Sequence, residues 1–84
     1  MNEYMNMRDI GKPFGLSPTK VGRELRDCGY RGEDRKPTRK AYAEGMAVVK
    51  RDAEHPEWIA YLWHRDKVTE LLEDFGFRRV VNDE

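Results

Sequence analysis

The stretch MRDIGKPFGLSPTKVGRELRDCG, residues 7–29, predicts two short helices joined by a glycine turn. In its first half, Ile10 and Phe14 recur at helical spacing, and Gly15 ends the segment. Pro13 removes one backbone donor late in this helix, so the helix must be short or bent.

The second half of the stretch carries the clearest helix signals in the chain. Ser17 is a good N-cap, and Pro18 falls at the first helical position, where a missing N–H costs nothing. Gly29 is placed to end the helix in the left-handed conformation. Between these ends, one narrow apolar stripe follows helical spacing: Val21, Leu25 and Cys28.

The spacing of five residues across this unit resembles the bacterial and phage helix-turn-helix motif. Gly11 permits close approach of the second helix, Gly15 makes the sharp turn, and Leu16 fills the space beneath it, with Ile10 and Val21 as core residues. The resemblance implies that the second helix lies in the major groove of DNA. The alternative is a purely structural helical hairpin, because glycine turns and apolar spacing recur in such pairs.

If the second helix contacts DNA, its outward residues and the charged loop after it are the candidate contacts. Hydroxyl groups suit phosphates or base edges, and an arginine can bind a guanine with two hydrogen bonds. Two carboxylates, Glu24 and Asp27, are interleaved, so the alternative is a solvated face with ion pairs. The candidate DNA-binding residues are Ser17, Thr19, Lys20, Arg23, Arg26, Arg35, Lys36 and Arg39.

Downstream of this unit, the pattern predicts a third short helix (39–44), strands at 46–49 and 58–63, and a last helix beginning at His64 or Arg65. Two strands after a helix-turn-helix resemble the winged-helix fold. The whole layout resembles small phage and plasmid proteins related to antirepressor C-terminal (KilA-C-like) domains. We therefore expect an α+β, winged-helix-like single domain over residues 1–79 with a frayed tail at 80–84. The last helix should bury one face: Val68, Leu71, Leu72 and Phe75.

Composition limits the chain to one small, highly charged domain. It has 84 residues, 38% of them charged, with 16 basic and 16 acidic side chains. The charges are unevenly placed: residues 1–51 carry twelve Lys/Arg and seven Asp/Glu (net +5), and residues 52–84 carry four and nine (net −5). A neutral chain can thus present a basic face to nucleic acid, or its halves can pair with each other. No apolar run is long enough for a membrane span, and no signal peptide is predicted.

The sequence gives little indication of a catalytic site. His55 lies in an acidic turn, and His64 is placed to cap a helix. Cys28, the single cysteine, fits a reducing compartment, and it has no partner at zinc-ligand spacing. The aromatic residues at 58, 61 and 63 suit a core, or alternatively a platform for single-stranded bases. We expect no catalytic residue, metal or cofactor.

These observations together predict a cytoplasmic protein that binds double-stranded DNA. The resemblance implies a transcriptional or replication regulator of phage or plasmid type, with a homodimer or another protein as a possible partner. The alternative is a protein-interaction module of the same fold, which would meet a partner protein through the aromatic strand or the acidic last helix. One feature distinguishes these two functions: DNA binding requires one face free of carboxylates that is shared by Thr19, Arg23, Arg35 and Lys36.

Overall fold

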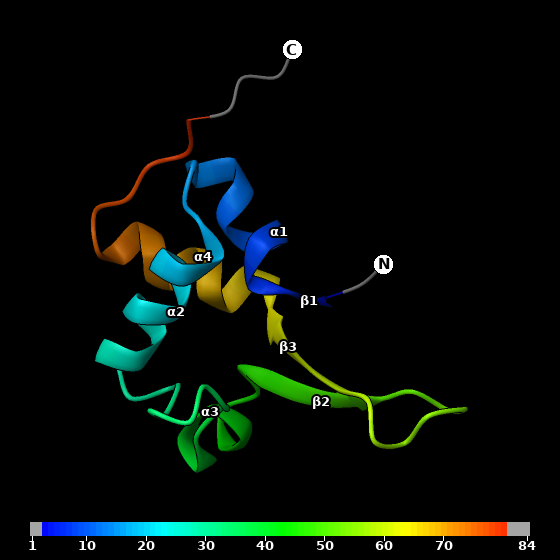
Figure 1. Ribbon diagram of the computed structural model, residues 1–84. Helices are drawn as coiled ribbons and strands as arrows, with labels where there is room; N and C mark the ends of the chain where they lie inside the picture. Colours follow the sequence, from blue (N-terminus) through cyan, green and yellow to red (C-terminus); the bar gives the residue numbers. More distant parts are fainter. Residues whose placement is uncertain (1–2, 81–84) are drawn as a thin grey trace.

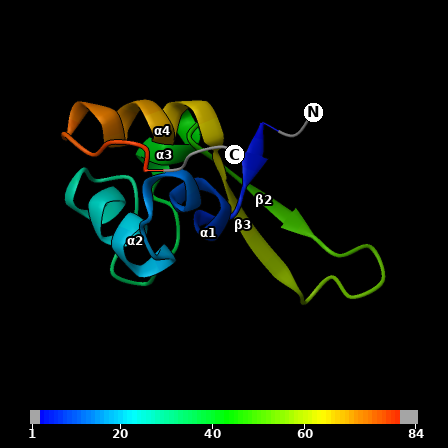
Figure 2. The same ribbon diagram turned by 90° about the horizontal axis from the view of Figure 1, so that it is seen from above.

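The computed structural model describes residues 3–80, and it is a small α+β domain, as the sequence predicts. Four α-helices and one 3₁₀ helix gather at one end, and a β-hairpin projects from them (Figures 1 and 2). This arrangement is consistent with a winged-helix-like domain. The elements in chain order are β1 (Tyr4–Met5), α1 (Met7–Gly11), η1 (Lys12–Phe14), α2 (Pro18–Asp27), α3 (Arg39–Ala43), β2 (Ala47–Arg51), β3 (Ile59–His64) and α4 (Arg65–Asp74).

The turn between the first two helices forms as its residues predict. Pro13 stops α1, and the chain tightens into η1 before Gly15 adopts a left-handed conformation at φ 68°. The N–H of Leu16 then donates to the carbonyl of Gly11 (3.0 Å), which closes the turn. Ser17 caps α2 by accepting from the N–H of Lys20 (3.2 Å). The predicted pair of helices is therefore confirmed.

Gly11 is the point of closest approach between α1 and the segment that follows it. A Cβ added there would lie 2.6 Å from the carbonyl oxygen of Leu16 and 2.7 Å from Cγ2 of Val21. Both distances are shorter than real Cβ contacts. The structure thus confirms that close packing at this position depends on glycine.

The three strands form one antiparallel sheet in the order β1-β3-β2. The register pairs Ala47 with Trp63 and Arg51 with Ile59. Both strands of the hairpin begin and end one or two residues later in the chain than predicted. They span 47–51 rather than 46–49, and 59–64 rather than 58–63. Arg51 joins the ladder although it is polar, because this end of the hairpin is exposed and needs no apolar residue there.

The core lies where α1, α2 and α4 meet the inner end of the sheet. Its largest fully buried side chain is Trp63, which is 1% exposed. The predicted face of α4 is correct only in part. Phe75 is 46% exposed because it ends the helix and turns outward, and Leu71 is half-buried. The buried hydrophobic residues are Ile10, Phe14, Val21, Leu25, Ala41, Met46, Ala47, Trp63, Val68 and Leu72.

The chain returns across the helices after α4. The N–H of Phe77 donates to the carbonyl of Leu72 (3.1 Å), the hydrogen bond expected of a Schellman end. Further on, the N–H of Val80 donates to the carbonyl of Pro13 (2.8 Å), so Val80 is not part of a frayed tail. The remainder of the predicted tail, residues 81–84, lies outside the described residues. Among residues 3–80, no helix combines the length and apolar character needed to cross a bilayer.

Candidate nucleic-acid interface

A groove rich in arginine lies between the exposed flank of α2 and the loop that follows the helix. Its volume is about 370 Å³. It contains four of the chain's arginines and a single carboxylate, Glu33. We call it the arginine groove, and its lining residues are Thr19, Arg23, Arg26, Arg31, Gly32, Glu33 and Arg35.

The helix side of the arginine groove follows from the amphipathic pattern of α2. Val21 and Leu25 are fully buried and fix which face of the helix meets the core. Thr19, Arg23 and Arg26 lie at i, i+4 and i+7 on the exposed flank. The buried stripe therefore orients the helix so that these three polar side chains line one wall.

The opposite wall is a tight loop held by its own backbone. Arg31 and Pro37 form an isolated antiparallel bridge, and the N–H of Gly32 donates to the carbonyl of Lys36 (2.9 Å). Inside it, the N–H of Lys36 donates to Oδ1 of Asp34 (3.0 Å), and Arg35 adopts a left-handed conformation at φ 68°. These bonds bring the side chains of the loop arginines to the groove.

The arginine groove carries concentrated positive charge, four arginines against the one carboxylate of Glu33. None of its four arginines has a carboxylate oxygen within 4.0 Å among the described residues. Partial burial, followed by the nearby charges of Arg35 and Arg26, lowers the pKa of Arg31 from its usual value. Arginine nevertheless stays charged in proteins, so the cluster repels itself and attracts anions.

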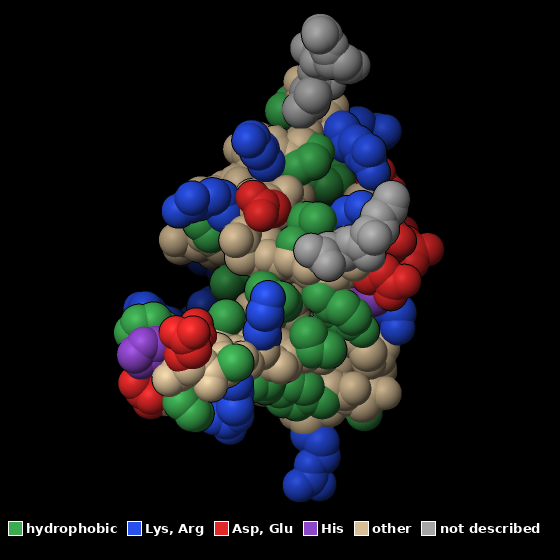
Figure 3. Space-filling model, turned by 90° about the vertical axis from the view of Figure 1, so that its right-hand side faces the viewer, with side chains coloured by type: hydrophobic (Ala, Val, Ile, Leu, Met, Phe, Trp, Pro, Cys, Tyr) green, Lys and Arg blue, Asp and Glu red, His purple; other side chains and the backbone are tan. Residues whose placement is uncertain are grey.

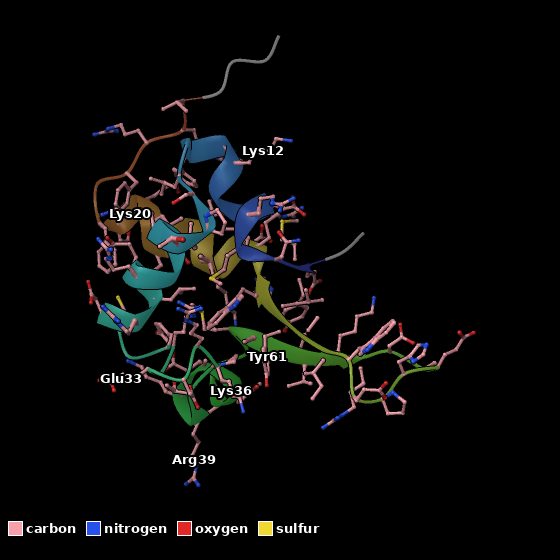
Figure 4. All side chains as sticks on the ribbon, in the orientation of Figure 1. Lys12, Lys20, Glu33, Lys36, Arg39 and Tyr61 are labelled. Atoms are coloured by element: carbon pink, nitrogen blue, oxygen red, sulfur yellow. The ribbon has the colours of Figure 1, made fainter. Side chains whose placement is uncertain are left out.

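The other predicted DNA-binding residues lie outside this groove. Ser17 uses its hydroxyl to cap α2. Lys20 pairs with Glu24 (3.3 Å), as the interleaved carboxylate suggests, and its Nζ lies 5.7 Å from the ring centroid of Phe77. Lys36 and Arg39 are exposed, and Arg39 extends from α3 away from the body of the domain (Figure 4). The expected carboxylate-free face is therefore found only in part, because Thr19, Arg23 and Arg35 line one groove but Lys36 does not, and Glu33 lies among them.

Arg31 is the groove arginine that is absent from the predicted DNA-binding set. Nothing local in the sequence shows which way its side chain turns. The available signal was Gly22, which stands beside the apolar stripe of α2 without a side chain of its own. A glycine on a helix surface often marks a place where another group packs closely.

The tip of the β2–β3 hairpin has a different chemistry. Trp58 is 58% exposed, and its ring stacks on His55 with 3.9 Å between centroids. Asp52 accepts from the N–H of Glu54 (2.8 Å) and from that of His55 (3.1 Å). Figure 3 views the hairpin end-on and shows acidic, basic, histidine and hydrophobic side chains gathered there. The aromatic residues at 58, 61 and 63 thus divide between surface and core, with only Trp63 fully buried.

Two of the side chains examined for catalytic chemistry are His64, which has a structural role, and Cys28, which lies in no cluster of metal-ligating residues within the described part of the chain. His64 caps α4, as predicted, since its Nδ1 accepts from the N–H of Lys67 (3.2 Å). Cys28 is half-buried rather than buried, and burial chiefly, with Glu24, raises the pKa of its thiol. Within residues 3–80, no three metal-ligating side chains lie together.

Comparisons with family models, curated proteins and solved structures returned no match to this chain.

Proposed function

We propose that the chain binds double-stranded DNA through α2 and the loop at residues 31–36. The observation that carries the proposal is the arginine groove, in which four arginines meet without a salt bridge to any described carboxylate. Arginine is suited to this role because its planar guanidinium can form two parallel hydrogen bonds with a phosphate or a guanine.

The dimensions of α2 support the same function. Its ten residues span about 15 Å, and the major groove of B-DNA is wide enough to admit a helix. Its flank offers Thr19 and Arg23 for base edges, while the loop beside it offers charge for phosphates. Together with the helix-turn-helix resemblance, this favours a transcriptional or replication regulator of phage or plasmid type, acting in the cytoplasm.

A salt titration with a labelled random-sequence duplex tests the proposal. Log K should fall linearly with log salt, and the double variant Arg26→Gln/Arg35→Gln should flatten the slope by roughly 0.9 for each phosphate that the variant no longer binds. The control Lys12→Gln/Arg78→Gln removes the same charge from exposed residues outside the arginine groove, and it should keep the parent slope. A parent chain without salt-dependent duplex binding would contradict the proposal.

A second candidate function is binding of a partner protein through the hairpin tip. It is favoured by the exposure of Trp58 and Ile59 beside the carboxylates of Asp52 and Glu57. Exposed aromatic residues are typical of protein interfaces, and the carboxylates of the tip, which stand against Lys50 and Arg51, make it a poor binder of phosphate. This function would be favoured if the duplex titration fails.

A further inference from the structure

The side chain of Arg31 crosses from the loop to the surface of α2 and lies on Gly22. A Cβ added at Gly22 would overlap Nη1 of Arg31 and lie 3.0 Å from its Cζ. Sδ of Met7 lies 3.4 Å from the same point. The missing side chain of Gly22 therefore leaves a notch that holds the guanidinium against the helix.

The guanidinium of Arg31 is incompletely satisfied in that notch. Its Nε is buried and has no hydrogen-bond partner among the described residues. No described carboxylate lies within 4.0 Å of the side chain, and the charges that lower its pKa are those of Arg35 and Arg26. A buried polar atom without a partner is rare in folded proteins, and here it belongs to a cation whose neighbours in the groove are three further arginines and one carboxylate, Glu33. The Nε atom is itself covered, but Arg31 also lines the arginine groove, where an anion would compensate its charge through the guanidinium nitrogens that face the groove.

We propose that Arg31, seated on Gly22, binds a backbone phosphate of the DNA together with Arg26 and Arg35. The inference rests on the proposed function and divides the arginine groove into two parts. The loop side holds a phosphodiester and fixes the position of α2, while Thr19 and Arg23 are left for base edges. Gly22 has the role of a positioning residue, because it acts through Arg31.

Two variants remove the same contact by different routes. Arg31→Gln deletes the guanidinium, and Gly22→Ala leaves it present but displaces it from the notch. We expect each to lower duplex affinity about tenfold and to flatten the salt slope by roughly 0.9, the value for a single phosphate. The double variant should bind no more weakly than either single variant, because both changes act on one contact.

The fold and the charge need separate controls. Gly22→Ala should keep the parent thermal midpoint or raise it, since alanine favours a helix more than glycine does. Arg78→Gln removes one exposed positive charge outside the arginine groove and should leave affinity near that of the parent. Arg31→Lys should recover the salt slope but not the full affinity, because an ammonium lacks the planar fork.

The outcomes separate this inference from the proposed function. If the parent binds duplex and both Arg31→Gln and Gly22→Ala match its affinity and slope, Arg31 is not the phosphate ligand although the protein binds DNA. If the parent fails to bind duplex, a titration with inorganic phosphate, monitored by NMR of the arginine Nε–H signals, tests whether Arg31 binds an anion at all. A phosphate-dependent shift of the Arg31 signal would support the site alone, and its absence would overturn both proposals.

Discussion

Arg23 lies on the exposed flank of α2, away from the buried pair Val21 and Leu25. Because it contributes nothing to the core, its removal should affect binding and spare stability. We expect Arg23→Ala to weaken binding to a specific site by about 1–3 kcal/mol and to relax base preference at one position. The measurement is a binding isotherm on selected sequences beside a thermal melt. Parent-like affinity on every sequence would show that α2 does not contact the bases through this residue.

Gly11 and Gly22 allow a matched pair of glycine substitutions, because each packs closely against a different kind of neighbour. A methyl group at Gly11 meets the backbone of Leu16 and the buried side chain of Val21, neither of which can move cheaply. A methyl group at Gly22 meets the flexible end of Arg31. We expect Gly11→Ala to cost about 1–3 kcal/mol of stability by overpacking. Chemical denaturation would measure it, and equal stability of the two alanine variants would contradict the close packing assigned to Gly11.

Single residues were predictable where their role depends on near neighbours in the chain. The caps at Ser17 and His64 each need only a residue of the right type before a helical pattern, and both form as expected. Arg31 was not predictable, because its position depends on the path of a loop that brings it back to Gly22. The sequence therefore indicated the charged surface but not the residue at the inner end of the arginine groove.

At the scale of elements, α4 shows how helical periodicity can overextend a buried face. Val68 and Leu72 are fully buried, while Leu71 is half-buried and Phe75 is exposed. The i, i+3, i+4, i+7 pattern continued past the point where the helix ends, and Phe77, beyond that end, packs against the core instead. The predicted boundaries of the hairpin strands were wrong by one or two residues for a related reason. The outer residues of these strands are solvated, so the alternation of apolar residues does not mark where strand pairing stops.

The uneven burial of α4 makes a graded prediction. Leu72→Ala should cost about 2–5 kcal/mol, a large part of the stability of so small a domain, and Leu71→Ala should cost less. Phe75→Ala should cost least of the three because the side chain is already exposed. Glu73→Ala is the control, since its contact with Arg79 (3.7 Å) is an exposed ion pair of little worth. Urea denaturation would rank the variants, and a Phe75→Ala loss equal to that of Leu72→Ala would contradict the packing described.

At the scale of the whole molecule, the neutral net charge conceals two separated regions. Four of the twelve basic residues of the first half line the arginine groove, and the described carboxylates of the second half lie at the hairpin tip, near Lys50 and Arg51, and on exposed positions of α4. The separation was visible in the sequence as net +5 before residue 52 and net −5 after it. The sequence did not show which surface each charge would occupy, because that depends on how the loop and the hairpin leave the core. If the chain binds DNA as proposed, we expect contact on the arginine-rich side.

The domain should not fold without the last quarter of the chain, residues 65–84. Val68 and Leu72 of α4 complete the core around Trp63, which is 1% exposed, and Val80 closes the chain back onto Pro13. A domain of this size has about 5–10 kcal/mol of stability in total, and uncovering several large apolar side chains would exceed it. We therefore expect the fragment 1–64 to show no cooperative thermal transition and no specific DNA binding.

Circular dichroism melts and amide NMR dispersion would test the fragment directly. A chain ending at Val80 is the control, and it should unfold cooperatively because it keeps every contact described above. A cooperatively folded 1–64 fragment would mean that α4 is an appendage to a self-sufficient helix-turn-helix and hairpin. The role assigned to Leu72 would then be wrong as well, since the fragment and the Leu72→Ala variant test the same packing at two scales.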